Sequence, residues 1–436
     1  MIRFMDKRSN TEVSKESGVG LDKKIAVIGL GYVGLPLAVE LSKSFPVVGF
    51  DICQQRIVEL KNGNDRTLEV PAEVLSDTDF ILTDDLQALR GVDIYIVTVP
   101  TPVHENCLPD FSPLQKACQM IGSVMTKGSI VVFESTVYPG VTRGMCGALL
   151  QEVSGLVCEK DFFLGYSPER INPGDHQHRL HNMTKVVAGS EPWVTEVLVE
   201  VYGAINKGDI FKAKSIEVAE AAKVLENTQR DINVAFMNEV AMICQKLDIS
   251  VYDVLDVAET KWNFLPFRPG LVGGHCIGVD PYYWACCARQ KGIDPHLTLS
   301  GRQTNESMSS FLVQEVVKRV AKGKVAVLGL TFKEDIPDLR NTKVMDLIAG
   351  LKENGYEVDV FDPLAYGQEA EELYGITLSS QMDQQRYQAI IAVVPHQAYR
   401  QLSSPEIDAA LGSNGWVIDL KGMWRDRVFS HSYWCL

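Results

Sequence analysis

Residues 24–34 read KIAVIGLGYVG, and this stretch decides the fold of the first part of the chain. Its apolar opening is typical of a buried parallel strand, and a helical stretch follows directly at 35–44. Gly29, Gly31 and Gly34 therefore lie between a strand and a helix. In that context the Gly-x-Gly-x-x-Gly pattern strongly indicates a dinucleotide site.

Each glycine has a separate task in such a turn. Gly29 permits the tight bend, Gly31 lets a pyrophosphate approach the backbone, and Gly34 lets the helix pack closely on the strand. Asp51 ends the next apolar run, 22 residues after Gly29. A carboxylate there can bind the ribose 2′-hydroxyl and would repel a 2′-phosphate, so the pattern predicts NAD as the cofactor.

Strand-like and helical segments alternate along the first part of the chain. Apolar runs at 47–51, 94–99 and 130–133 predict further buried strands, and hence a doubly wound α/β domain over 23–205. The polar residues 1–22 before it are interpreted as a leader.

A long helix is predicted next. Residues 216–249 contain no Pro or Gly, and at 1.5 Å per residue they would form a helix roughly 50 Å long. That is too long for one small domain, so we expect the helix to join domains or to pack against a second subunit. It dominates a helical middle region, 206–310.

The last region, 311–436, repeats the layout of the first. Residues 324–330 read KVAVLGL, and a helical stretch and a second run ending at Asp362 follow, without the glycine pattern. The predicted fold class is therefore α/β, with two Rossmann-like doubly wound domains joined by a helical middle domain with one long central helix.

Composition excludes several functional classes. The 436 residues carry a formal charge of −14, which argues against a nucleic-acid partner or an anionic membrane surface. We find neither an apolar run long enough to span a membrane nor a signal-peptide core, and expect a cytoplasmic protein. The ten cysteines include no C-x-x-C pair, so we expect most to be reduced, and no metal site is predicted.

Cys276 follows a glycine-rich loop, and residues 270–280 read GLVGGHCIGVD. A nicotinamide cofactor needs no thiol to accept a hydride, but a thiol can hold an aldehyde for a second oxidation. If Cys276 is a nucleophile, the chain oxidises an alcohol to an acid; if it is only packed, an ordinary two-electron dehydrogenase is indicated. Asp280 precedes Pro281 and can be a helix N-cap, a catalytic carboxylate, or both.

Other polar residues are candidates by position. Lys223 and Asn227 share one stripe of the long helix, where a lysine can be a catalyst or a solvated flank. Glu169 and Arg170 lie in a loop rich in Pro and Gly, and Thr136 follows a predicted strand, where ligands of α/β sheets bind.

Taken together, these motifs resemble the nucleotide-sugar 6-dehydrogenases, the UDP-glucose/GDP-mannose dehydrogenase family, over residues 23–425. The GHCIGVDPYY form at 274–283 is similar to the branch acting on UDP-N-acetylhexosamines. The motifs that carry the resemblance are GLGYVGLP (29–36), VPTP (99–102), ESTVYPG (134–140), SPERI (167–171), FRPG (267–270), GGHC (273–276), TFKED (331–335) and RNT (340–342).

The resemblance implies a role for each matched residue. Cys276 would be the nucleophile, Lys223 and Asn227 would stabilise an oxyanion, and Asp280 would support Lys223 or a water. Glu169 and Thr136 would position or activate water. The implied cofactor-binding residues are Gly29, Gly31, Tyr32, Val33, Gly34, Asp51, Arg56, Thr101, Thr136 and Arg340. The implied substrate-binding residues are Glu169, Arg170, Lys223, Asn227, Arg268, Gly273 and Lys333.

The implied reaction is an NAD-dependent four-electron oxidation of the sugar C6 hydroxyl to a uronate, through a thiohemiacetal and a thioester on Cys276. UDP-N-acetylglucosamine is the favoured substrate, with UDP-N-acetylgalactosamine, UDP-N-acetylmannosamine and UDP-glucose as alternatives. Surface polysaccharide biosynthesis (O-antigen or capsule) is the implied pathway, and a homodimer or higher homo-oligomer is expected. Two other classes are a 6-phosphogluconate-type dehydrogenase and a non-catalytic NAD-binding sensor.

Overall fold

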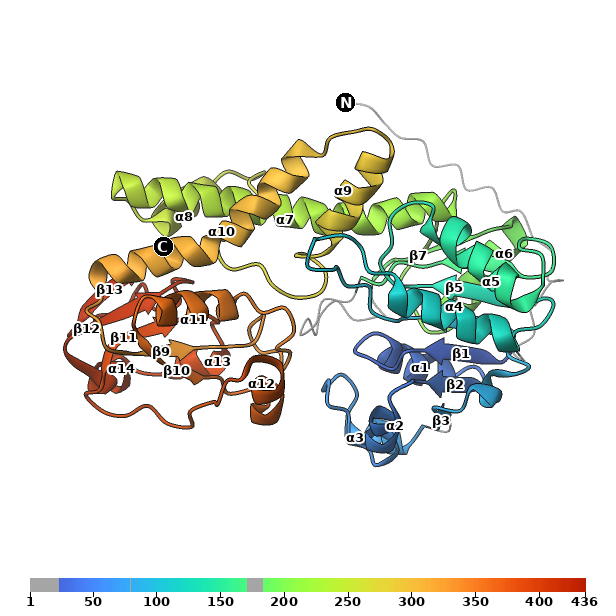
Figure 1. The fold of residues 1–436 in the computed structure, drawn as a ribbon, viewed down its shortest axis with the longest axis horizontal. Helices are drawn as coiled ribbons and strands as arrows, with labels where there is room; N and C mark the ends of the chain where they lie inside the picture. The colour runs from blue at the N-terminus through green and yellow to red at the C-terminus, as the bar shows by residue number, and fades with distance from the viewer. Residues whose placement is uncertain (1–22, 79, 171–182) are drawn as a thin grey trace, which may run out of the picture.

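The computed structural model describes residues 23–78, 80–170 and 183–436, so the predicted leader lies outside the described residues. Two sheets form separate halves, and one long helix, α7 (Ile216–Leu247), runs across both (Figure 1). The predicted fold class is confirmed. No helix in the described part of the chain is long and apolar enough to cross a membrane.

The N-terminal sheet has eight strands in the order β3-β2-β1-β4-β5-β6-β7-β8. The first six in this order are parallel, as in a dinucleotide-binding fold, whereas β7 runs antiparallel to β6. The strands are β1 (Ile25–Ile28), β2 (Val47–Phe50), β3 (Ile81–Thr83), β4 (Ile94–Val97), β5 (Ile130–Phe133), β6 (Phe163–Tyr166), β7 (Lys185–Gly189) and β8 (Ile210–Lys212).

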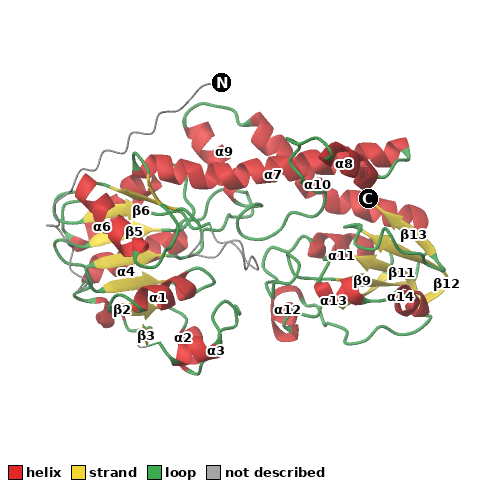
Figure 2. Ribbon diagram, turned by 180° about the vertical axis from the view of Figure 1, so that it is seen from behind, coloured by secondary structure: helices red, strands yellow, loops and turns green. Residues whose placement is uncertain are grey.

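Helices cover both faces of this sheet and bury an apolar core on each side (Figure 2). The continuous apolar strands predicted from the sequence are buried because both faces are covered. The helical segments are α1 (Gly34–Ser42), α2 (Gln54–Lys61), α3 (Ala72–Ser76), η1 (Leu86–Leu89), α4 (Ser112–Val124), η2 (Thr142–Cys146), α5 (Gly147–Ser154) and α6 (Pro192–Gly203).

The middle region confirms the predicted long helix. Helix α7 begins after Ser215, whose hydroxyl accepts a hydrogen bond from Val218 N, and ends at Leu247; the cap residue Asp248 has a left-handed conformation with φ of 56°. It therefore stops two residues before the predicted end. The remaining helices here are α8 (Val251–Glu259), α9 (Asp280–Gln290) and α10 (His296–Arg319), and α9 and α10 pack on α7.

A buried polar network fastens α7 to its surroundings. The guanidinium of Arg302, which is 2% exposed, donates to Asp231 Oδ1 at 2.5 Å, and Asn305 donates to the same oxygen at 2.7 Å. Asn238 on α7 exchanges two hydrogen bonds with the backbone of Gly270. The loop that carries Cys276 is therefore anchored to the long helix.

The C-terminal half contains a five-stranded parallel sheet in the order β10-β9-β11-β12-β13. Its strands are β9 (Lys324–Leu328), β10 (Glu357–Phe361), β11 (Tyr387–Ala392), β12 (Leu411–Asp419) and β13 (Ser432–Cys435). Its helices are α11 (Val344–Glu353), α12 (Gly367–Tyr374), α13 (Gln397–Gln401) and α14 (Ser404–Ala410).

In both halves, an aspartate after the second strand accepts a hydrogen bond from the turn after the first strand. Asp51 Oδ2 accepts from Leu30 N at 2.8 Å, and Asp362 Oδ2 accepts from Leu330 N at 2.6 Å. In the C-terminal half, however, the fully buried His396 ring lies 3.1 Å from Asp362 Oδ2. These hydrogen bonds outweigh burial and lower the pKa of Asp362 to about 2.

Candidate active site

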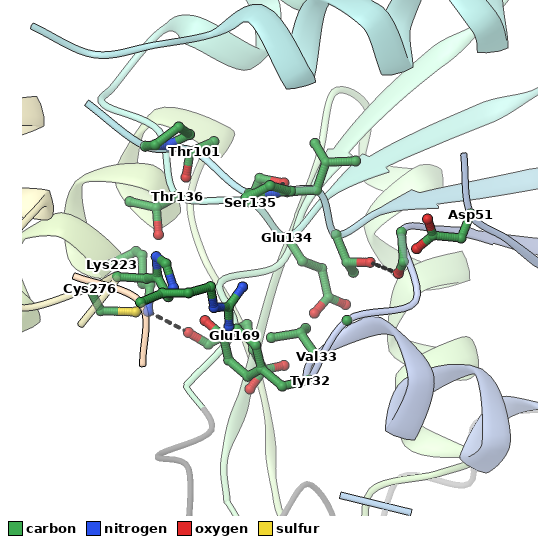
Figure 3. Close-up of a pocket in the computed structure, with 18 residues that line it drawn as sticks. Tyr32, Val33, Asp51, Thr101, Glu134, Ser135, Thr136, Glu169, Lys223 and Cys276 are labelled. Atoms are coloured by element: carbon green, nitrogen blue, oxygen red, sulfur yellow. Dashed lines mark hydrogen bonds between the residues drawn. The ribbon is translucent and has the colours of Figure 1, made fainter. Parts of the chain in front are cut away.

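A cavity opens at the carboxyl ends of the N-terminal strands, next to the point where the strand order reverses between β1 and β4 (Figure 3). Segments after β1, β4, β5 and β6 supply one wall, and α7, the Cys276 loop and the C-terminal half complete it. The lining residues are Gly29, Gly31, Tyr32, Val33, Asp51, Thr98, Val99, Pro100, Thr101, Pro102, Glu134, Ser135, Thr136, Glu169, Lys223, His275, Cys276 and Arg340.

The glycine turn has the geometry that a dinucleotide requires. A Cβ on Gly34 would lie 1.8 Å from the Gly29 carbonyl oxygen, so α1 can approach β1 only with glycine there. A Cβ on Gly31 would meet no atom within 4 Å, so the backbone is open towards the cavity. Gly31 thus leaves room for a pyrophosphate at the start of α1, where backbone N–H groups favour negative charge.

Asp51 is placed to receive the ribose of such a cofactor. Its two carboxylate oxygens accept from Leu30 N and Cys53 N, both at 2.8 Å, which holds the side chain at the cavity wall. Each oxygen keeps a lone pair that can accept a hydroxyl hydrogen bond. The residues present therefore fit NAD.

Arg56 is not brought to the cavity wall. The side chain is 5% exposed, its Nε donates to the Leu30 carbonyl at 2.9 Å, and it pairs with Asp65 at 2.7 Å. The structure thus places Arg56 as a support of the glycine turn.

The Cys276 thiol borders the cavity and is half-buried. Burial raises the pKa of this thiol, and Asp280 raises it further. Lys223 and a hydrogen bond from Tyr32 lower the pKa and so favour the thiolate. The thiol therefore depends on nearby cations and donors for its reactivity.

Lys223 and Glu169 meet at the cavity. Lys223 Nζ donates to the Glu169 carbonyl oxygen at 2.7 Å, so α7 is joined to the loop after β6 (Figure 3). Thr136 lines the same cavity from the segment after β5. The structure thus brings together Cys276, Lys223, Glu169 and Thr136, which the sequence predicted as one site.

Asn227 and Asp280 form the adjoining pair. Asn227 Nδ2 donates to Asp280 Oδ2 at 2.5 Å, and Asp280 Oδ1 is buried with no hydrogen-bond partner among the described residues. Burial raises the pKa of Asp280 to about 6, against the opposing effect of Lys223. Val279 takes the N-cap position of α9, and Asp280 is already in the first turn. The carboxylate interpretation therefore fits better than the cap interpretation.

The C-terminal half reaches the same cavity through Arg340. Its guanidinium pairs with Asp338 at 2.7 Å and lies 5.9 Å from the centre of the Tyr32 ring. Tyr32 therefore links the glycine turn to the thiol and to the other half. Gly273 packs against the C-terminal half, because a Cβ there would lie 2.6 Å from the Asn341 carbonyl oxygen.

Five predicted substrate residues lie outside the cavity lining: Asn227 and Gly273, described above, and Arg170, Arg268 and Lys333. Arg170 pairs with Glu226 of α7, and Arg268 pairs with Glu259 of α8. Lys333 follows β9, in a turn where its carbonyl accepts from the Thr331 hydroxyl at 3.1 Å. Their predicted contacts with substrate stay predictions.

Several lining residues were not predicted as site residues. The sequence placed Glu134 and Ser135, with Thr136, after a predicted strand where ligands bind, but gave these two residues no individual role. His275 precedes the thiol, and burial, with a smaller effect of Arg340, lowers its pKa to about 4. The neutral ring is therefore favoured. The sequence signal that could have identified these residues is their position, since Glu134 and Ser135 follow β5 and His275 ends the glycine-rich loop.

Comparison with protein families covers most of the chain. Residues 23–206 match the NAD binding domain of the UDP-glucose/GDP-mannose dehydrogenase family, 217–307 its central domain and 326–426 its UDP binding domain. The chain belongs to the UDP-glucose/GDP-mannose dehydrogenase family. This dehydrogenase is an NAD-dependent oxidoreductase, in agreement with the glycine turn and Asp51.

Relatives and solved structures resemble the dehydrogenase over nearly its whole length. It is 47% identical over 397 residues to UDP-N-acetyl-D-glucosamine 6-dehydrogenase of Salmonella typhi, covering 89% of this chain and 93% of the relative. It is 48% identical over 408 residues to the Pseudomonas aeruginosa protein of the same name, with 92% and 97% covered. The structure of UDP-D-ManNAc dehydrogenase from Pyrococcus horikoshii superposes with a TM-score of 0.84 at 28% identity, with 94% and 98% covered.

Proposed function

We propose that this dehydrogenase oxidises the C6 hydroxyl of UDP-N-acetylglucosamine to the carboxylate in two successive two-electron steps. The observation that carries the proposal is the shared cavity of the Cys276 thiol, the Lys223 ammonium and the glycine turn. A simple alcohol dehydrogenase has no use for a thiol between its cofactor turn and a buried lysine. NAD, when bound, accepts one hydride in each oxidation.

The chain's own residues would act on the C6 oxygen and carbon. In the first oxidation, Lys223 and Asn227 stabilise the developing oxyanion, and donors of this kind are worth about 3 kcal/mol each in known sites. The Cys276 sulfur then forms a bond to the C6 aldehyde, giving a thiohemiacetal that cannot escape. The second oxidation converts it to a thioester.

Hydrolysis completes the reaction. Water, positioned by Glu169 and Thr136, adds to the thioester carbonyl, the C–S bond breaks, and the Cys276 thiolate is released. One alcohol, one water and two NAD give one carboxylate, two NADH and three protons. Asp280 beside Asn227 would support the oxyanion donors rather than react.

Two relatives that are almost half identical and are named for UDP-N-acetyl-D-glucosamine support this substrate. Protein CapL of Staphylococcus aureus, 47% identical over 410 residues, supports a role in surface polysaccharide synthesis. The Pyrococcus structure favours UDP-N-acetylmannosamine as the second candidate. The match of 326–426 to a UDP binding domain supports a UDP-linked sugar in either case.

A second copy of this chain would cover an exposed apolar face of α7, α8 and the following loop. Large apolar side chains here are open to solvent, up to 88% for Trp262. A face of this length rarely stays uncovered in water. We propose that two copies pair through it. The residues are Phe236, Ile243, Leu247, Val254, Val257, Trp262 and Leu265.

The Cys276→Ser variant tests the covalent chemistry. We expect wild-type protein to form two NADH per uronate from UDP-N-acetylglucosamine and the variant to show no steady turnover, because a serine ester would form slowly or stall. Cys287→Ser, which changes a half-buried cysteine of α9, is the matched control. Uronate formation at the wild-type rate by Cys276→Ser, or one NADH per sugar, would contradict the covalent scheme. Parallel assays with UDP-N-acetylgalactosamine, UDP-N-acetylmannosamine and UDP-glucose decide the sugar.

A further inference from the structure

A buried ionic cluster lies directly behind Glu169, and the chemistry proposed above gives it no role. It consists of Glu134 after β5, Lys185 at the start of β7 and Tyr202 on α6. All three residues are at most 5% exposed. Glu134 also lines the cavity, so the cluster connects the wall of the site to the interior of the N-terminal domain.

Lys185 holds two carboxylates at once. Its ammonium donates to Glu134 Oε2 at 2.9 Å and to Glu169 Oε2 at 3.0 Å. The same ammonium lies 5.0 Å from the centre of the Tyr202 ring, and the Tyr202 hydroxyl donates to the other oxygen of Glu134. The two carboxylates are thus joined through one cation.

Two carboxylates share the ammonium of Lys185 in this cluster. Ionising both places like charges close together in a buried site, which is costly. Burial, together with Glu169, raises the pKa of Glu134 to about 7, even though Lys185 and Tyr202 oppose the increase. Below a pH of about 7, Glu134 therefore holds a proton beside the Lys185 ammonium.

Two lysines hold Glu169. Lys185 fixes its carboxylate, and Lys223 donates to its backbone carbonyl oxygen at 2.7 Å. The second carboxylate and its position at the cavity indicate a task in the reaction.

We propose that Lys185 is a positioning residue that keeps the Glu169 carboxylate ionised and fixed at the cavity wall, with Glu134 as the second carboxyl on the same ammonium. The inference rests on the proposed function, in which Glu169 positions or activates the hydrolytic water. An ionised Glu169 can accept a proton from that water. The overall oxidation releases three protons, so a group held in its basic form is needed in each turnover.

Lys185→Met tests the inference through the pH dependence of kcat. Removing a cation within hydrogen-bond distance raises the pKa of a carboxyl by about 1–3 units. We therefore expect the acidic limb of the profile to move up by about 1–3 pH units, with activity recovering at higher pH. Lys185→Arg keeps the charge and should restore most of the wild-type profile. An unmoved limb, or an equal loss at every pH in a folded variant, would overturn the inference.

Glu134→Gln keeps the inference testable if Lys185→Met does not fold. An amide resembles a protonated carboxyl, so the acidic limb should stay at its wild-type position. Stability gives a second readout. Because the folded state holds the Glu134 proton more tightly than the unfolded state, this group makes wild-type stability fall as pH rises from about 4.5 to 7. Glu134→Gln should flatten this fall, and an identical fall in variant and wild type would count against a protonated Glu134.

A matched control separates this cluster from ordinary ion pairs. Lys212 on β8 pairs with Glu196 at 2.7 Å, with half of the lysine side chain exposed. Lys212→Met removes a lysine from the same domain and should leave the profile unchanged; a shift equal to that of Lys185→Met would overturn the assignment. A wild-type protein inactive on every UDP-sugar would refute the proposed function itself, whereas active wild type with an unmoved Lys185→Met limb refutes only this inference.

Discussion

Two single-methyl substitutions in the glycine turn should separate stability from cofactor binding. Gly34→Ala would place a Cβ 1.8 Å from the Gly29 carbonyl oxygen and 2.4 Å from the Thr98 hydroxyl. The carbonyl oxygen belongs to the backbone and cannot give way unless α1 moves off β1. Gly31→Ala adds the same methyl group three residues earlier, where no protein atom lies within 4 Å.

The expected magnitudes differ in kind. Overpacking of this sort costs about 1–3 kcal/mol, and the backbone clash of Gly34→Ala belongs at the upper end. For a domain of this size each kcal/mol lowers Tm by about 2–4 °C, so we expect a fall of about 6–12 °C. For Gly31→Ala the free energy of unfolding should change by less than about 0.5 kcal/mol. Its methyl group would instead meet the pyrophosphate, which raises the Kd for NAD about 5- to 150-fold.

Thermal melting without ligand and fluorescence titration with NADH measure the two effects separately. The outcome that supports the geometry is a crossed pattern, with Gly34→Ala unstable and Gly31→Ala stable but weak in binding. Gly34→Ala melting with wild type would show that α1 adjusts freely. Wild-type NADH affinity in Gly31→Ala would show that the pyrophosphate does not approach this backbone.

Two further predictions concern the other parts of the molecule. Phe236→Glu should weaken self-association at least about 100-fold in sedimentation, because each of the two copies otherwise buries a phenylalanine side chain worth about 1.5–3 kcal/mol. The control Val428→Glu changes a residue that is 88% exposed elsewhere on the molecule, and it should leave self-association unchanged. An unchanged assembly mass for Phe236→Glu would reject pairing through α7. Asp362 has a depressed pKa, so its contribution of about 2 kcal/mol is present above pH 4 and is lost as pH falls towards 2. Asp362→Asn should remove that part of the acid dependence in thermal melts; an identical acid dependence would contradict the role of the His396 contact.

Much of the fold could be predicted from local sequence patterns. The turn at Gly29 and the strand ending at Asp51 depend on neighbours within a few residues, and such signals are legible in a single chain. The uninterrupted stretch from Ile216 predicted α7 to within two residues, because nothing in it breaks a helix. The recurrence of strand, helix, strand and aspartate predicted the second doubly wound half.

Contacts between residues far apart in the chain could not be predicted from the sequence. Lys185 gave no local signal, since its carboxylate partners lie 16 and 51 residues away. Arg56 is drawn to a buried aspartate rather than to the cavity, and nothing in its spacing indicated this. Asp280 showed the same limit, because only the path of α7 reveals that Asn227 is its partner.

The proposed nucleophile belongs to neither nucleotide-binding half. Cys276 lies on the segment between them, which is anchored to α7 through Gly270 and Asn238, and it shares a cavity with the glycine turn and with Arg340. Under the proposed chemistry a spent cofactor must be exchanged while the half-oxidised sugar waits. Because Cys276 lies on the segment between the two halves, the covalent intermediate can stay bound to that segment. The N-terminal half can meanwhile release NADH and bind a new NAD.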